Sequence, residues 1–250
     1  MTLQDIYDQL AYGELRNIVM GSGGIGNTEE SIPEDKFEII LPFIALGLTE
    51  LHKRFLLHEN ELTLDLVPGK GTYVITKDYA VSNTKSKQPV KYILDTDSPF
   101  ESDLMRIERV YATYRDKEYE VPLNEIDNAM GVRSTASHLL QVPTDSTKAP
   151  WLLETTSLRV VYRANHPRIS KHLAISSPAQ VAVNLPDTHL EPLLWYVASR
   201  AHNPKGISNE FHEGNNYAGK FEASCQRLIT ENLQVQSHDE IDKFHDRGFC

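Results

Sequence analysis

The sequence predicts an α+β protein in which an antiparallel helical bundle carries a β-rich insertion and ends in an extended C-terminal tail. Three observations predict this fold class. Apolar residues recur at helical spacing near both ends of the chain, they alternate with polar residues in the middle, and the final segment is polar and charged. The expected boundaries place the bundle at residues 1–60 and 185–228, the β-rich insert at 61–184 and the tail at 229–250.

Two helices are expected at the start of the chain. Thr2 can cap a first helix over residues 2–20, because its side chain can accept hydrogen bonds from the first turn. A second helix is expected to begin at Pro33, with Pro42 as a kink inside it. The apolar faces that predict these helices are Leu3, Ile6, Tyr7 and Leu10 in the first, and Phe37, Ile40, Leu41, Ile44, Leu48, Leu51 and Phe55 in the second.

The middle of the chain has the two-residue alternation of β-strands. Residues 61–67, 72–76 and 157–164 alternate apolar and polar side chains, and so does the longer stretch 105–121. The polar and small residues of 124–150 interrupt this pattern, so we expect an excursion from the sheet with short helical turns.

Helical spacing returns near residue 187 and predicts a helical hairpin. The sequence Asn-Pro-Lys-Gly at 203–206 is a stop-and-turn signal between two helices. The second of them has a helix-packing seam, with steps of three and four, made of Phe211, Gly214, Ala218, Phe221, Cys225 and Leu228.

Composition excludes several classes of protein. The 250 residues include 35 acidic and 25 basic side chains, a formal net charge of −10 that disfavours holding nucleic acid through its phosphates. Cys225 and Cys250 are the two cysteines, too few for a disulfide framework. The longest apolar run is too short to cross a bilayer and contains Pro42. We therefore expect synthesis in the cytoplasm and no contact with a membrane.

The glycine-rich segment 21–26, Gly-Ser-Gly-Gly-Ile-Gly, has the letters of a dinucleotide-binding fingerprint. That motif works between a strand and a helix that follows directly. Here a predicted helix precedes the glycines, and six residues separate Gly26 from the start of the next helix. We interpret the segment as a loop between helices, and a nucleotide-binding enzyme that uses it stays an alternative.

Two acidic or histidine-containing segments resemble metal sites only in part. Asp95, Asp97 and Asp103 lack the glycine that a calcium loop needs at its bend, where Phe100 stands instead. The tail holds His238 and Asp242 at helical spacing, without a scaffold to fix them. We expect no metal, no cofactor and no catalytic residues.

The helical hairpin carries a resemblance to a known family. Residues 193–202 (LLWYVASRAH), the turn at 203–206 and residues 209–228 (NEFHEGNNYAGKFEASCQRL) resemble the C-terminal hairpin of the head-to-tail adaptor proteins, also called connector or head-completion proteins, of tailed bacteriophages. The resemblance implies a structural virion protein without enzyme activity. It implies a ring, typically of twelve copies, that joins the portal protein to a tail or nozzle protein and forms part of the DNA conduit.

The same resemblance suggests which residues contact partners. The charged C-terminal tail is expected to bind the portal, with Phe244, Arg247, Phe249 and Cys250 as its contacts. Polar residues on both helices of the hairpin are expected to contact neighbouring copies in the ring. They are Arg200 on the first helix and, on one face of the second, His212, Asn216 and Lys220.

The expected location is the virion neck, after synthesis in the host cytoplasm. An acidic balance suits a conduit that DNA passes without sequence-specific binding, because like charges repel. A different morphogenetic role, such as a tail terminator or an assembly chaperone, is the nearer alternative to an adaptor.

Overall fold

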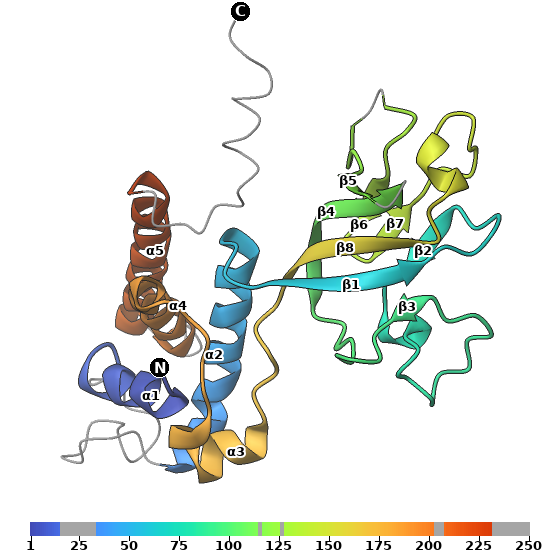
Figure 1. The fold of residues 1–250 in the computed structure, drawn as a ribbon. Coiled ribbons are helices and arrows are strands. Elements are labelled where there is room, and N and C mark those ends of the chain that lie inside the picture. The colour runs from blue at the N-terminus through green and yellow to red at the C-terminus, as the bar shows by residue number, and fades with distance from the viewer. Residues whose placement is uncertain (16–33, 115–116, 126–127, 203–207, 232–250) are drawn as a thin grey trace, which may run out of the picture. The chain divides into compact units, whose positions relative to one another are not determined.

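The computed structural model describes residues 1–15, 34–114, 117–125, 128–202 and 208–231, and these residues form two compact units (Figure 1). One unit takes Met1–Leu57 together with His166–Cys250, and the other is His58–Asn165. The described α-helices, all in the first unit, are α1 (Leu3–Tyr12), α2 (Glu34–Arg54), α3 (Lys171–Ser176), α4 (Leu190–His202) and α5 (Ser208–Thr230).

The first helix begins where its sequence predicts. Thr2 caps α1: the Asp5 backbone N–H donates to Thr2 Oγ1 at 3.3 Å, and the Thr2 N–H donates to Asp5 Oδ2 at 2.7 Å. This reciprocal capping box satisfies two donors that the first turn of a helix otherwise leaves open. The four predicted apolar residues of α1 are fully buried.

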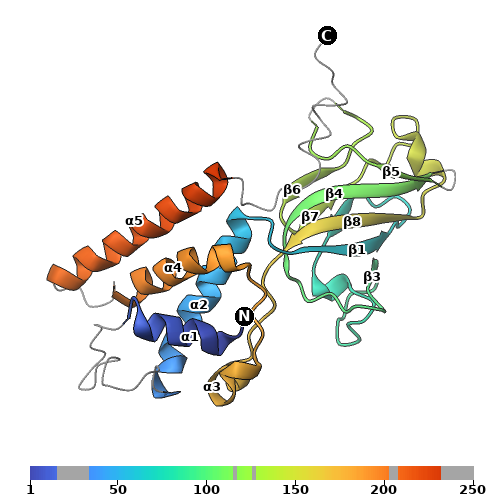
Figure 2. The same ribbon diagram turned by 60° about the vertical axis from the view of Figure 1, so that its left-hand side comes forward.

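The second helix buries its predicted stripe. All seven predicted apolar residues, from Phe37 to Phe55, are buried in the core of the helical unit. α2 continues through Pro42 as one assigned helix. α4 packs against both α2 and α5, and Figure 2 shows α4 and α5 running side by side. The three helices thus share one core.

The other unit contains all of the described strands, in two antiparallel sheets. The larger sheet has the order β3-β1-β8-β4-β5, and the smaller has the order β2-β7-β6. The inner faces of both sheets contribute to one apolar core. The strands are β1 (Glu59–Asp65), β2 (Thr72–Val74), β3 (Ile93–Leu94), β4 (Leu104–Tyr114), β5 (Lys117–Glu120), β6 (Arg133–Ala136), β7 (Leu139–Gln141) and β8 (Ser157–Ala164).

The predicted fold class, a helical bundle that carries a β-rich insertion, is wrong. The described residues form a mixed α/β protein with eight strands in two antiparallel sheets and five α-helices. Among these residues, 21 buried hydrophobic side chains form the core of the strand unit and 23 form that of the helical unit. Each unit therefore has a core of its own, and the strand unit is not a small insertion. The error has a physical origin: β6 and β7 lie in residues 124–150, interpreted as an excursion, and they complete the second layer that a sheet needs.

The unit boundary also lies elsewhere than the sequence suggests. Residues 166–184, expected in the insert, belong to the helical unit, where Ala174 and Val183 are buried in its core. The Leu3 backbone N–H donates to the Val181 carbonyl at 2.9 Å, and the Val183 N–H donates to the Met1 carbonyl at 3.0 Å. At the other end α5 runs to Thr230, past the expected start of the tail at 229, and residues 232–250 lie outside the described part of the chain.

Candidate protein-binding groove

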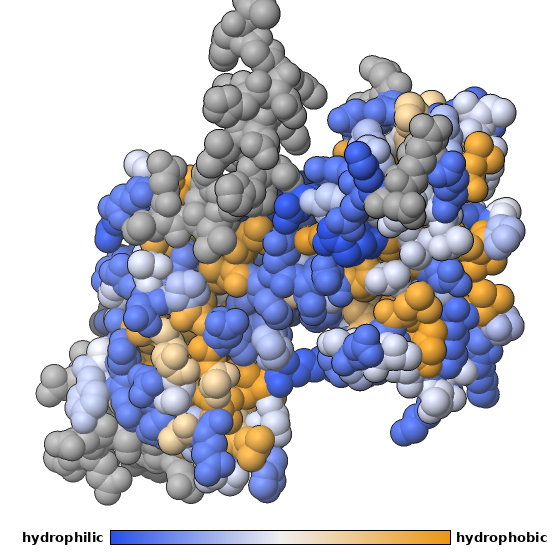
Figure 3. All heavy atoms as spheres, in the orientation of Figure 1, coloured by the Kyte–Doolittle hydropathy of each residue, from blue (hydrophilic) through white to orange (hydrophobic). Residues whose placement is uncertain are grey.

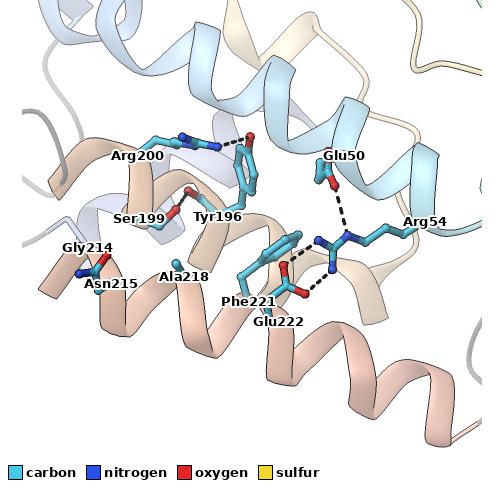
Figure 4. A pocket seen from close by; sticks show the side chains of 10 residues that line it. All are labelled: Glu50, Arg54, Tyr196, Ser199, Arg200, Gly214, Asn215, Ala218, Phe221 and Glu222. Carbon is cyan, nitrogen blue, oxygen red and sulfur yellow. Dashed lines mark hydrogen bonds and ion pairs between the residues drawn. The ribbon is translucent and has the colours of Figure 1, made fainter. Parts of the chain in front are cut away.

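An open groove lies between α2 and α5, with α4 as its floor (Figure 4). Its volume is about 330 Å³, within the range of ligand and side-chain pockets. Its lining combines four charged residues with two aromatic rings and small residues. They are Glu50, Arg54, Tyr196, Ser199, Arg200, Gly214, Asn215, Ala218, Phe221 and Glu222.

A bidentate ion pair joins the two walls at one end of the groove. Arg54 of α2 donates from its two terminal nitrogens to both carboxylate oxygens of Glu222 on α5, at 2.6 and 2.7 Å. Its Nε also donates to Glu50 at 3.3 Å, and the guanidinium lies over the Phe221 ring, 4.8 Å from the centroid. The hydrogen bonds from Arg54 hold the pKa of Glu222 below its ordinary value. The charge of Arg54 is therefore matched within the protein.

A second arginine, Arg200, is placed differently. It is exposed, its guanidinium lies 5.2 Å from the centroid of the Tyr196 ring, and it donates a long hydrogen bond of 3.4 Å to the Tyr196 hydroxyl. Within the described residues no carboxylate pairs with it. The groove thus has one neutralised end and one end with an unmatched positive charge.

Three residues of the α5 wall, Gly214, Ala218 and Phe221, belong to the packing seam that the sequence predicts. Gly214, Phe221, Cys225 and Leu228 are buried as that pattern predicts. Ala218 is exposed and lines the groove instead. One position of the seam is therefore turned toward an open space and not toward a partner helix of the same chain.

Lys220, expected beside Arg200 in one contact surface, lies at a different place. Its ammonium stacks over Trp195 at 4.6 Å and over Tyr217 at 5.1 Å, and neither ring lines the groove. Tyr217 also lies 5.0 Å from the His202 ring, and His202 Nδ1 is 3.2 Å from Glu213. The rings of Trp195, Tyr217 and His202, with the Lys220 ammonium over the first two, form an aromatic cluster outside the groove lining.

The remaining predicted contact residues are only partly described. Asn216 is exposed on α5 outside the groove lining. The side chain of His212 lies outside the described part, and so do Phe244, Arg247, Phe249, Cys250 and the glycine segment 21–26. Of the expected ring contacts whose side chains the structure describes, Arg200 lines the groove, and Asn216 and Lys220 do not.

The outer face of the larger sheet in the strand unit carries a ladder of paired charges. Arg159 of β8 donates to both oxygens of Glu118 at 2.7 and 2.6 Å, and to Glu61 at 3.0 Å. Its guanidinium also lies 4.3 Å from the centroid of the Tyr111 ring. On the neighbouring strands Arg109 donates to Glu59 at 2.8 Å. This face is charged but balanced, which suits a solvated sheet surface.

Two side chains that could take part in chemistry, Cys225 and Asp95, have structural roles among the described residues. Burial raises the pKa of the Cys225 thiol to about 11, which disfavours the nucleophilic thiolate. Burial alone would raise the pKa of Asp95, but hydrogen bonds from Ser82 and from the Phe100 N–H outweigh it and hold that pKa below its usual range. Among the described residues no cluster of three or more His, Cys, Asp or Glu is arranged to hold a metal ion.

Comparison with known proteins leaves the chain without an assigned family. It matches no protein-family model and shows no significant similarity to a curated protein sequence. None of the helices in the described residues has the length and apolarity needed to span a bilayer. The groove is therefore interpreted from its own residues.

Sequence reasoning missed most of the groove. Glu50 and Arg54 are four residues apart near the end of a predicted helix, a spacing that indicates an ion pair on one helix face. Nothing in the sequence indicates that Glu222, 168 residues away from Arg54, completes that pair.

Proposed function

We propose that the chain is a structural virion protein, a head-to-tail adaptor subunit that joins the portal to the tail of a bacteriophage and forms part of the DNA conduit. The observation that carries the proposal is the open groove over the hairpin whose sequence resembles such adaptors. Its two aromatic rings and two arginines are residue types that are enriched at the anchor positions of protein–protein contacts.

The charge of the protein supports the same role. A net charge of −10 disfavours sticking to DNA, and a conduit has to let a duplex slide. In this proposal the helical unit makes the contacts between copies, and the C-terminal residues bind the portal. The strand unit, with its balanced outer face, offers a rigid surface for a tail or nozzle protein.

Quantitative mass spectrometry of purified particles tests the role directly. In virions of the phage whose genome encodes the chain, we expect the chain at a small fixed copy number, near that of the portal. A chain found in assembly intermediates but missing from finished particles would instead be an assembly chaperone.

Binding to purified portals tests the assignment of the tail. Because α5 extends to Thr230, the variant to use ends at residue 231 and leaves every described helix intact. We expect the full chain to decorate portals and the truncated chain to keep its circular dichroism spectrum and lose the decoration. A truncated chain that still decorates portals refutes the assignment of the tail to portal binding.

A nucleotide-binding enzyme that uses residues 21–26 is the alternative from a different class. Thermal unfolding with NAD or ATP distinguishes it, because a ligand that binds the folded state raises the unfolding temperature with its concentration. Under the adaptor proposal neither compound shifts that temperature.

A further inference from the structure

The groove has the arrangement of a helical bundle that lacks one helix. α2 and α5 form its walls and α4 its floor, and the exposed Ala218 leaves room for close approach along the α5 wall (Figure 4). Antiparallel bundles are completed when a further helix packs between two walls of this kind. The occupant that suits the groove best is therefore a helix.

An exposed apolar strip extends the groove along α2. Leu46, one turn before the groove residue Glu50, is 53% exposed, and Ile39, seven residues earlier on the same helix face, is 44% exposed. Figure 3 shows hydrophobic side chains at the surface over α2. Large apolar side chains aligned on one helix face indicate a contact surface more than scattered ones do.

Charge specifies the occupant further. Arg54 at one end is already matched by Glu222 and Glu50, whereas Arg200 has no carboxylate partner among the described residues. Its guanidinium is held against Tyr196, which fixes its direction. A partner helix that carries a carboxylate level with Arg200 would give this guanidinium an ion-pair partner.

The same chain contains a helix edge of this kind. α1 buries its apolar face, and Asp8 lies at the border of its outer edge. The Asp8 carboxylate accepts a hydrogen bond from Gln4 at 2.7 Å, and no cation pairs with it among the residues that the structure places. Tyr12, one turn further along α1, is 58% exposed.

We propose that the outer edge of α1 in one copy binds the α2/α4/α5 groove of a second copy, with Asp8 paired to Arg200. The two surfaces are different, so the contact is head-to-tail and each copy keeps a free groove or a free edge for the next. The inference rests on the proposed adaptor role for its biological meaning, since it names the contact between neighbouring subunits.

A charge-swap experiment with the full chain tests the contact. Sedimentation velocity measures self-association of the wild type, Asp8→Arg, Arg200→Glu and the double variant up to several hundred micromolar. We expect association of the wild type, weakening by about tenfold or more in each single variant, and recovery in the double variant. Arg168→Glu is the matched control, because Arg168 is exposed on the same unit outside the groove, and it should associate as the wild type does.

Folding is checked independently by circular dichroism, and Asp8→Asn and Arg200→Gln repeat the test with smaller changes. A wild type that stays monomeric, single variants that associate normally, or a double variant that does not recover would each overturn the inference. A chain that associates through the groove but is absent from virions keeps the inference and overturns the proposed function. A chain that is present in virion necks, but whose association is unchanged by the charge swap, keeps the proposed function and overturns the inference.

Discussion

Arg54 and Glu222 join α2 to α5 through two hydrogen bonds of 2.6 and 2.7 Å, across 168 positions of sequence. The pair is bidentate, because two N–H groups of the planar guanidinium donate to the two oxygens of the carboxylate. It fixes the distance between the two walls of the groove at one end. The shape of the groove therefore depends on this pair.

Replacing Arg54 with alanine is expected to lower the free energy of unfolding by roughly 1–2 kcal/mol, since it removes the bidentate pair and the contact with Phe221. The loss of stability stays in this range because Glu222 is 56% exposed, and water screens its attraction to Arg54. Arg227→Ala is the control: its ion pair with Glu191 is 3.8 Å long and exposed, so the change should stay within about 0.5 kcal/mol. Urea unfolding measures both, and equal effects of the two variants would contradict the role of Arg54.

The pH dependence of Glu222 should follow from its lowered pKa. Hydrogen bonds from Arg54 favour the charged carboxylate in the folded state, so its contribution is present above the unfolded pKa of a glutamate. That contribution is lost as pH falls through the folded pKa. We expect Glu222→Gln to be less stable than the wild type at pH 7 and to approach it below pH of about 4. A stability difference that does not change between these pH values would argue against the pair.

Glu14, in the segment after α1, should show the opposite dependence on pH. Burial raises the pKa of its carboxyl, and its Oε2 atom is buried without a hydrogen-bond partner among the described residues. The folded state therefore binds the proton more tightly, and rising pH makes this group increasingly unfavourable to folding. We expect Glu14→Gln to raise the thermal unfolding temperature at pH 7 and to lose that advantage in acid. An unchanged or lower temperature at pH 7 would contradict this account.

The strand unit should fold alone. It has its own core, and its ends are tied together because the Ala164 backbone N–H donates to the His58 carbonyl at 2.9 Å. A fragment of residues 58–165 is expected to give a β-type circular dichroism spectrum and a cooperative unfolding transition. As a control, Val160→Asp places an unpaired charge in the core and should abolish that transition. A wild-type fragment without a transition would show that the core needs the helical unit.

Local signals in the sequence predicted α1, α2, α4, α5 and the long strands, although α1 ends at Tyr12 and not at residue 20, and α3 was missed. Thr2 caps α1, the stripe from Phe37 to Phe55 is buried, and the alternation at 105–121 corresponds to the β4–β5 pair, because these patterns depend on neighbours a few residues away. The short strands β6 and β7 were missed. They are three or four residues long, too short for a period to appear, and β2, the partner of β7, lies more than sixty positions before it.

The groove could be predicted only in part, for the same reason. Arg200 was singled out from the polar face of the hairpin, and it lines the groove. Lys220, which helical spacing placed on one face with His212 and Asn216, was expected in the same contact surface, but it packs on Trp195 of the neighbouring helix. Spacing on one helix indicates which residues share a face, whereas the neighbour that covers that face depends on tertiary packing.

Cryo-electron microscopy of the virion neck tests the central claim most directly, that the chain is a structural subunit between portal and tail. The account predicts a closed ring of copies below the portal, whose helical units contact one another and whose C-terminal residues reach the portal. A neck map in which the ring between portal and tail is built from another protein, with no density for this chain, would contradict it.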